Sequence, residues 1–149
     1  MTAGNEIWFD TVEPVQIQGL VSGNMLEHLG LTFTRVGPDF LQATMPVDRR
    51  TKQPFGILHG GASVVLAETL GSVAANLCVD PNVKMCVGLD LSSNHIREVT
   101  EGTVTGTARP LHLGGRTQVW EIQIEDEGER LVNTTRLTLL VLDRPQIRP

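Results

Sequence analysis

The stretch that most constrains this chain runs from Phe55 to Val79, FGILHGGASVVLAETLGSVAANLCV, and it contains one formal charge, Glu68. A run so rich in small and apolar residues predicts a helix over roughly residues 60–79 that is buried on most sides, because it has no broad polar face for water. The central charge favours a buried helix over a membrane span. Since one sheet can cover only one face of this helix, we expect a second copy of the chain to cover much of the rest.

The segments around this helix have the pattern of β-strands. Trp120, Ile122 and Ile124 alternate with polar residues, which is typical of a half-buried strand. The connections between the later strands are too short for crossover helices, so the sheet is expected to be mostly antiparallel. The sequence therefore predicts an α+β domain in which one long central helix packs against a curved sheet of five to six strands. The predicted strands cover residues 31–36, 40–47, 85–95, 103–109, 118–125 and 131–142.

Composition narrows the class of protein. The chain has 149 residues without a repeat or linker, so we expect one domain, with residues 1–24 as a lead-in and 143–149 as a tail. A net charge of −5 and an aromatic content of 4% argue against a nucleic-acid-binding protein. The two cysteines, Cys78 and Cys86, are too few for a disulfide framework and indicate reduced thiols. No export signal is visible, and a cytoplasmic protein without a membrane partner is expected.

Glu68 is the first candidate for chemistry. It shares a helical stripe with Ser72 and Asn76, at spacings of i, i+4 and i+8. The stripe could simply face water, although a water-facing stripe usually carries several charges. Alternatively, a carboxylate in a semi-buried cleft would act as a nucleophile or a general base, and Ser72 would orient it or a water molecule. Both interpretations are open at this point.

The sequence His59-Gly60-Gly61 precedes Glu68 and marks the start of the predicted helix. A helix N-terminus has unpaired N–H groups, and glycine lets a ligand approach them closely, so the Gly60 N–H could bind an oxyanion or polarise a carbonyl. Gln53, in the preceding loop, could add a side-chain donor or hold a water molecule. The alternative is a tight turn that needs glycine. A carboxylate about two turns later favours a site on which donor and nucleophile converge.

A second glycine-rich segment, residues 112–117, lies between two predicted strands. Backbone N–H groups at a glycine pair, together with Arg116, could bind a phosphate, and Arg97 is a candidate for a second cation. An ordinary β-turn with a surface arginine is an equally good interpretation. A metal site is not expected, because the four histidines lack ligand spacing and no carboxylate pair accompanies them.

The segment TKQPFGILHGGASVVLAETLGS, followed by NHIR and PLHLGGRTQVWEIQI, closely resembles the hotdog-fold acyl-CoA thioesterases. The similar subgroup includes the Arthrobacter-type 4-hydroxybenzoyl-CoA thioesterase, the 1,4-dihydroxy-2-naphthoyl-CoA thioesterase and the enterobactin proofreading thioesterase. The resemblance covers about residues 25–142. It implies a hotdog fold, homotetramers built from dimers, and an active site at the dimer interface.

The resemblance also implies a role for each matching residue. Glu68 would be the catalytic carboxylate, and the Gly60 N–H would polarise the thioester carbonyl. His59 and Gln53 would bind the carbonyl or position water, and Ser72 would hold Glu68 or the water. The substrate would be bordered by Gly88, His95, Ile96, Arg97 and Glu98. The CoA arm would be bound by His112, Leu113, Gly114, Gly115, Arg116 and Thr117; some relatives have serine at the position of Gly115, which puts one hydroxyl contact to CoA in doubt.

The expected reaction is the hydrolysis of an acyl-CoA thioester, with an aromatic acyl group, to a free acid and CoA, without a separate cofactor. Whether Glu68 attacks the carbonyl or deprotonates a water molecule is left open. One alternative is a proofreading thioesterase that acts on aryl groups bound to an acyl carrier protein, for which Arg49, Arg50 and Lys52 would supply a basic docking surface. The other is a non-catalytic acyl-CoA sensor, which would be expected to lack the carboxylate.

Overall fold

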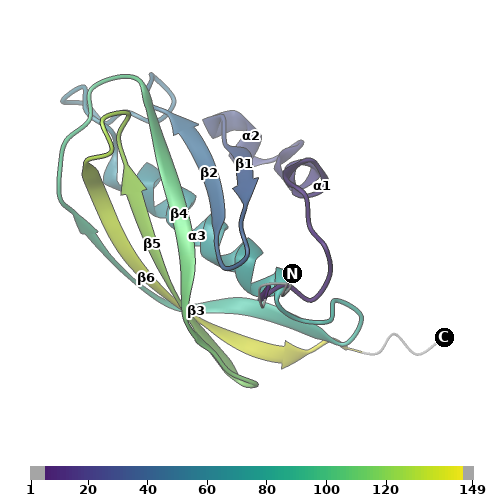
Figure 1. Cartoon of the computed structure of the whole chain (residues 1–149). Coiled ribbons are helices and arrows are strands. Elements are labelled where there is room, and N and C mark those ends of the chain that lie inside the picture. The colour runs from purple at the N-terminus through teal and green to yellow at the C-terminus, as the bar shows by residue number, and fades with distance from the viewer. Residues whose placement is uncertain (1–5, 146–149) are drawn as a thin grey trace, which may run out of the picture.

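The computed structural model describes residues 6–145, which form one curled antiparallel sheet around a long helix, α3 (Figure 1). The sheet has six strands in the order β1-β2-β4-β5-β6-β3, and every neighbouring pair is antiparallel. This confirms the α+β architecture and all six predicted strands, and it is the arrangement that the hotdog resemblance implied. The strands are β1 (Thr32–Val36), β2 (Leu41–Pro46), β3 (Lys84–His95), β4 (Thr103–Leu113), β5 (Thr117–Glu125) and β6 (Leu131–Asp143).

Helix α3 (Gly60–Leu77) begins where the sequence predicted and ends two residues earlier. One face packs into the concave side of the sheet, where Leu66 and Leu70 are completely buried. The sheet approaches so closely that a Cβ on Gly106 of β4 would lie 2.5 Å from Leu70 Cδ1. Neither α3 nor any other helix within residues 6–145 is long and apolar enough to cross a membrane.

Strand β4 is longer than predicted. The sequence indicated an end at Arg109, and the next residue, Pro110, cannot donate a ladder hydrogen bond. The structure places a register shift between Pro110 and His112, and pairing with β5 continues to Leu113. A bulge of this kind accommodates the proline and lets the strand continue. His112 and Leu113 therefore belong to a strand, and the loop before β5 is reduced to residues 114–116.

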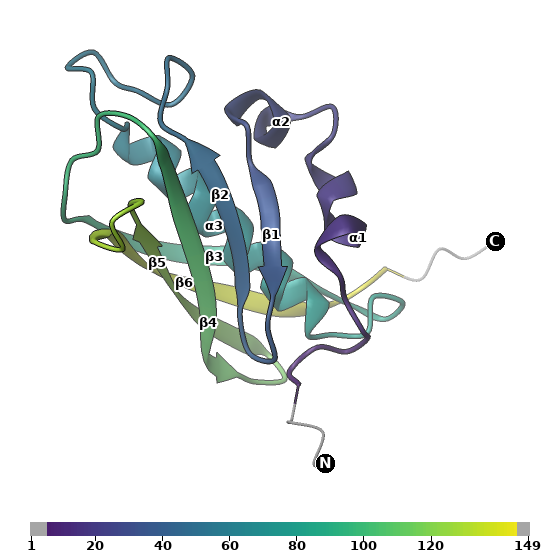
Figure 2. The ribbon, with the colours of Figure 1, turned by 45° about the horizontal axis from the view of Figure 1, so that its top comes forward.

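The lead-in covers one edge of the sheet. Helix α1 (Pro14–Gln18), a 3₁₀ turn (Gly19–Val21) and helix α2 (Met25–Leu29) lie beside β1 (Figures 1 and 2). The Gln18 side chain accepts a hydrogen bond from the Phe33 N–H at 2.8 Å and donates to the Leu31 carbonyl. It therefore occupies backbone groups that an edge strand would otherwise present to another chain.

The other edge is open. Strand β3 has twelve residues and pairs only with β6 among the described strands. From Gly88 onwards most of its residues are exposed, and Leu89, at the register shift, is 60% exposed. A long unpaired edge of this kind is a template for pairing with a second strand.

The far end of α3 is closed by the first described residues of the chain. The Phe9 N–H donates to the Leu77 carbonyl at 2.9 Å, and Trp8 stacks on Trp120 with ring centroids 6.4 Å apart. The Trp8 indole N–H also donates to the Gly37 carbonyl at 2.7 Å. This segment ties the lead-in to both the helix and the sheet.

Asn76 joins the same end of α3 to strand β3. Its side chain exchanges two hydrogen bonds with the backbone of Cys86, at 2.9 and 3.0 Å, and donates to the Ser72 carbonyl. Asn76, which the sequence placed on the stripe of Glu68, therefore has a structural function.

Candidate active site

A pocket of about 300 Å³ opens where α3 begins, β3 ends and β6 starts. It brings together residues that are far apart in sequence. Six predicted site residues line it: Gln53, Gly60, His95, Ile96, Arg97 and Glu98. The resemblance had assigned two of these residues, Gln53 and Gly60, to the thioester carbonyl. It had assigned the other four, residues 95–98, to the border of the substrate. The structure assembles them in one place, which we call the donor pocket.

Gly60 and His95 are in close contact in the donor pocket. A Cβ on Gly60 would lie 2.7 Å from His95 Nε2, so any larger residue would displace the imidazole. Gly60 is the first residue of α3, and within residues 6–145 no group accepts a hydrogen bond from its N–H. The positive end of the helix dipole therefore presents a free donor next to the imidazole.

Gln53 lies opposite this helix start, on a short turn that is tied by two backbone hydrogen bonds. Its N–H donates to the Ile57 carbonyl and its carbonyl accepts from the Gly56 N–H, both at 2.9 Å. Gly56 has a positive φ of 80°, which glycine adopts without strain. The Gln53 side-chain oxygen accepts a hydrogen bond from the Phe55 N–H. Since the oxygen is occupied, the amide nitrogen is the part of Gln53 left to donate to a ligand.

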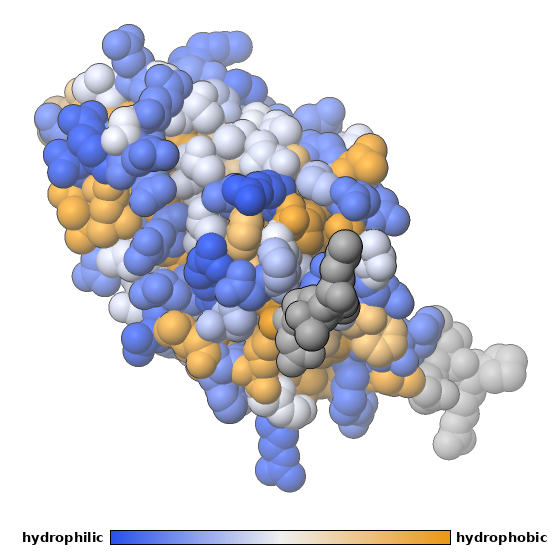
Figure 3. All heavy atoms as spheres, in the orientation of Figure 1, coloured by the Kyte–Doolittle hydropathy of each residue, from blue (hydrophilic) through white to orange (hydrophobic). Residues whose placement is uncertain are grey.

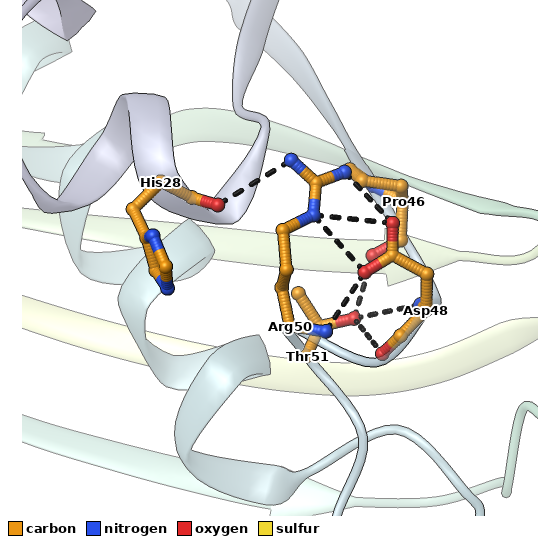
Figure 4. Close-up of polar contacts among 5 residues, drawn as sticks. All are labelled: His28, Pro46, Asp48, Arg50 and Thr51. Carbon is orange, nitrogen blue, oxygen red and sulfur yellow. Dashed lines mark hydrogen bonds and ion pairs between the residues drawn. The ribbon is translucent and has the colours of Figure 1, made fainter.

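The turn before Gln53 is held by an ion pair (Figure 4). The Arg50 guanidinium donates to the Asp48 carboxylate at 2.7 Å, and the Thr51 hydroxyl donates to the Pro46 carbonyl, also at 2.7 Å. The hydrogen bonds from Arg50 lower the pKa of Asp48 from 3.8 to about 2. This turn fixes the path of the chain from β2 to the donor pocket.

His59 does not line the donor pocket. Its Nδ1 accepts a hydrogen bond from the Gly61 N–H at 2.8 Å, which makes it the N-cap of α3. Its ring lines a separate hollow with Arg50, Lys52 and Val65. Within a single chain, His59 thus shapes the helix start and does not reach the Gly60 and His95 side of it.

Glu68 is exposed in the single chain, and its Oε1 lies against Gly88 of β3, 3.3 Å from the position that a Cβ on Gly88 would occupy. It is eight residues after Gly60, which is about 12 Å along a helix. Ser72 follows one turn later, and within residues 6–145 its hydroxyl forms no hydrogen bond to Glu68. The convergence of donor and carboxylate that the sequence suggested therefore does not occur within one chain.

The glycine-rich hairpin is also far from the donor pocket of its own chain. The Gly114 N–H donates to the Thr117 carbonyl at 2.9 Å, and the Arg116 carbonyl accepts from the Val141 N–H at 2.9 Å. The donor pocket borders β6 at Val132, and nine residues of a strand span about 30 Å. Arg116 is exposed and Gly115 has open space around it. Glu68 and the hairpin thus lie towards one end of the sheet, and the donor pocket lies at the other.

Behind the donor pocket is a buried polar group that the sequence analysis missed. Asn133 is completely buried and Thr135 is 2% exposed, because both lie on the concave face of β6. Asn133 contacts His95 and Ser93 across the β3–β6 pair. The sequence contained a signal for this group. Asn133 and Thr135 occupy alternate positions of the strand that continue as Leu137 and further apolar residues, so two polar residues stand where apolar ones are expected.

Two other kinds of catalytic group, a metal cluster and an activated thiol, are not found among residues 6–145. Among residues 6–145, no three histidine, cysteine or acidic side chains cluster in a way that could hold a metal ion. Both cysteines are free thiols. Burial raises the pKa of Cys78 to about 12 and also raises the pKa of Cys86, which makes both thiols poor nucleophiles.

The fold and the donor pocket define a hotdog-type α+β enzyme with donors at the start of its central helix. Residues 55–133 match the model of the thioesterase superfamily, and the chain belongs to that superfamily and is a thioester hydrolase. It is 52% identical over 136 residues to the 1,4-dihydroxy-2-naphthoyl-CoA hydrolase of Escherichia coli K12, with 91% of this chain and 99% of that protein aligned. It is 53% identical over 120 residues to a proofreading thioesterase of Cronobacter sakazakii, with 80% of this chain and 87% of that protein aligned.

Solved structures agree with these relatives. A thioesterase of Haemophilus influenzae superimposes with a TM-score of 0.91 at 45% identity, over 95% of this chain and 99% of that one. A mutant thioesterase of Pseudomonas aeruginosa gives a TM-score of 0.92 at 42% identity, over 93% of this chain and 100% of that one. The family resemblance found in the sequence is thereby confirmed.

Proposed function

We propose that this chain hydrolyses an aromatic acyl-CoA thioester, giving a free aryl carboxylic acid and CoA. The observation that carries the proposal is the donor pocket, in which the free Gly60 N–H, the Gln53 amide and the His95 imidazole face one space. Donors arranged in this way can stabilise the oxyanion that forms when a thioester carbonyl is attacked, and each such donor contributes roughly 3–4 kcal/mol in known hydrolases. The reaction uses only water and the thioester, so no separate cofactor is part of the proposal.

Glu68 is proposed as the catalytic carboxylate, supplied by a second copy of the chain. In one route it deprotonates a water molecule that attacks the carbonyl carbon. In the other it attacks the carbon itself, and water then hydrolyses the mixed anhydride. In both routes the C–S bond breaks and the CoA sulfur leaves with a proton. Ser72, one turn from Glu68, is proposed to hold the water, and His59 contributes by fixing the helix start.

The second copy is proposed to pair through the open edge of β3. Glu68 lies against Gly88 of this strand, and His95 of the same strand faces Gly60. Gly88 and His95 are seven residues apart. Antiparallel pairing of two β3 strands, centred near Leu91, would bring Gly88 of one chain opposite the end of β3 in the other. Glu68 of one chain would then face the donor pocket of the second copy, so that a dimer would contain two complete sites.

The hairpin would enter the same composite site from the Glu68 side. Arg116, exposed and next to a glycine pair, is proposed to bind a CoA phosphate, with residues 112–117 along the pantetheine arm. Leu111, Leu113 and Leu142 are 51%, 42% and 41% exposed around this hairpin. In Figure 1 the turn between β4 and β5 lies at the bottom of the molecule, and Figure 3, in the same orientation, shows orange apolar surface near this lower edge. Apolar surface of this kind is suited to burial against substrate or against further copies in the proposed tetramer.

The aromatic acyl group is supported by the relative from Escherichia coli, which is named for a dihydroxynaphthoyl thioester. The Cronobacter relative, named as a proofreading thioesterase, supports the alternative of aryl groups on an acyl carrier protein. Docking of an acidic carrier protein would use the cations Arg49, Arg50 and Lys52. Because Arg50 is already paired with Asp48, this basic surface is smaller than the sequence suggested. We therefore favour CoA thioesters as the main substrates of a cytoplasmic enzyme.

Hydrolysis assays with a thiol reagent test this function. The panel is benzoyl-, hydroxynaphthoyl-, hexanoyl- and palmitoyl-CoA, together with an aryl-loaded carrier protein. We expect aryl-CoA turnover in the wild type and a loss of at least about 100-fold in Glu68→Gln. The matched control, Glu101→Gln, alters an exposed carboxylate outside the donor pocket and should leave turnover unchanged.

The outcomes separate the candidates. If no substrate is turned over while aryl-CoA binding is retained, the proposed hydrolysis is wrong and the chain is an acyl-CoA-binding protein. Faster turnover of the carrier-bound group would favour proofreading.

A mixing experiment tests whether the site is shared between two copies. Glu68→Gln and Gln53→Ala chains are refolded together. A mixed dimer keeps one intact site, so activity should reappear on mixing, whereas a site within one chain would give none.

A further inference from the structure

The polar group behind the donor pocket differs from the rest of the concave sheet face. On β6, Leu137 and Leu139 are buried and apolar, whereas Asn133 is completely buried and Thr135 is 2% exposed. Burying an amide is unfavourable unless each of its polar atoms is hydrogen-bonded. Within residues 6–145, no buried side-chain nitrogen or oxygen lacks a partner, so this cost is offset by specific contacts.

The contacts of Asn133 form a closed set. Its Oδ1 accepts a hydrogen bond from the Thr135 hydroxyl at 2.7 Å. Its Nδ2 donates to the Ser93 hydroxyl at 2.9 Å and lies 3.0 Å from His95 Nδ1. The Ser93 and Thr135 hydroxyls are themselves 2.8 Å apart. The β3–β6 register, which pairs His95 with Asn133 and Ser93 with Thr135, holds all four residues in place.

With the Asn133 amide in this orientation, its contacts assign the position of the hydrogen on the neutral His95 ring. An amide nitrogen has two hydrogens and donates only, so His95 Nδ1 is the acceptor. A neutral imidazole that accepts at Nδ1 has its hydrogen on Nε2. His95 Nε2 is the atom that faces Gly60, at 2.7 Å from the position of a Cβ. The ring hydrogen therefore points to the start of α3, beside the free Gly60 N–H.

We propose that Asn133 is a positioning residue that holds His95 as its Nε2–H tautomer, and that His95 is thereby a hydrogen-bond donor to the thioester carbonyl. This inference rests on the proposed function for its catalytic part. It explains how His95, which the sequence analysis placed along the substrate border, acts as one of the donors in the donor pocket. Asn133 itself does not touch the substrate.

The first test measures the tautomer directly, without substrate. Protein with ¹⁵N-labelled histidine is studied by two-dimensional ¹H–¹⁵N NMR at a pH where the ring is neutral, and His95→Gln assigns the signal among the four histidines. We expect a protonated Nε2 and an unprotonated Nδ1. In Asn133→Asp the carboxylate can only accept, so Nδ1 should become protonated. A wild-type ring with its hydrogen on Nδ1, or a tautomer unaffected by Asn133→Asp, would overturn the proposal.

The second test asks whether Asn133 acts through His95. We expect Asn133→Leu to lower kcat by about 100-fold, the effect of losing one oxyanion donor, with a smaller change in KM. In a His95→Ala background, the same substitution should cost less than about threefold, because the donor is already absent. Equal losses in both backgrounds would make Asn133 merely structural and overturn the proposal.

A matched control and a second variant keep the result interpretable. Asn76→Ala removes another asparagine with three hydrogen bonds, at the far end of α3, and should lower stability while leaving the His95 tautomer unchanged. If Asn133→Leu does not fold, Asn133→Asp, which has the same shape, serves in the same cycle. Since the NMR result does not depend on turnover, failure of the thioesterase assays and failure of this inference are distinguishable.

Discussion

At its C-terminal end, α3 has two of its last carbonyl groups occupied: Leu77 accepts from Phe9, and Ala75 accepts from Cys78, the Cys86 thiol and Gln118. At its N-terminal end, the Gly60 N–H has no partner within residues 6–145 and faces a pocket. Both ends belong to the same helix in the same sheet, so the difference does not follow from fold class. The difference suggests that stability is concentrated where the helix ends and ligand binding where it begins.

The largest expected effect comes from opening the closed end. Trp8→Ala removes the ring that stacks on Trp120 at 6.4 Å and the hydrogen bond to Gly37. We expect a loss of about 3–5 kcal/mol in the free energy of unfolding, measured by urea denaturation, with kcat per folded molecule unchanged. Trp8→Phe is the control: it keeps an aromatic ring and should lose only about 1 kcal/mol, the value of the hydrogen bond. Equal losses would show that the stack contributes nothing.

The next effect comes from filling the open end. Gly60→Ala places a methyl group where His95 Nε2 now lies, so the imidazole must move away. We expect kcat/KM for aryl-CoA to fall by about 100-fold, while the melting temperature changes little because alanine favours a helix. Gly19→Ala, at a glycine with helical φ and no atom nearby, should leave both unchanged. A large fall in melting temperature for Gly60→Ala would instead assign the contact to stability.

The smallest effect concerns the turn that leads to the open end. Because Arg50 lowers the pKa of Asp48 from 3.8 to about 2, ionised Asp48 stabilises the folded state above pH 4, and this stabilisation is lost as the pH falls from 4 to 2. Acid titrations followed by circular dichroism should show that wild type is more stable than Asp48→Asn above pH 4 and that the difference disappears near pH 2. A difference that persists at pH 2 would contradict the assignment.

The sequence predicted the elements well, because the apolar helix and the alternating strands are local patterns. It ended β4 too early, since the effect of Pro110 depends on a bulge that only pairing with β5 reveals. The axial separation of about 12 Å between Gly60 and Glu68 could have been calculated from the helical rise alone. The contact between Asn133 and His95 could not, because it depends on the register between two strands that are 38 residues apart in sequence.

For the candidate site, the structure gives the positions of the predicted residues, and their roles stay predictions. The resemblance named residues that the structure gathers into the donor pocket, among them Gln53, Gly60 and His95. It did not indicate that Glu68 and the hairpin lie towards the opposite end of the sheet from the donor pocket, because it implied an interface site without assigning its residues to one chain or the other. That assignment depends on three-dimensional spacing.

The unequal edges of the sheet determine how far assembly can proceed. Gln18 occupies backbone groups beside β1, whereas β3 is open. In the dimer proposed above, two copies would join through β3, and the outer edges of the joined sheet would both be β1. Because Gln18 and the lead-in helices lie along β1, such a dimer would offer a third copy no edge as open as β3, and the association would close on a two-fold axis. The helix of five residues that ends at Gln18 would in this way limit the growth of the assembly from the end of the sheet opposite β3.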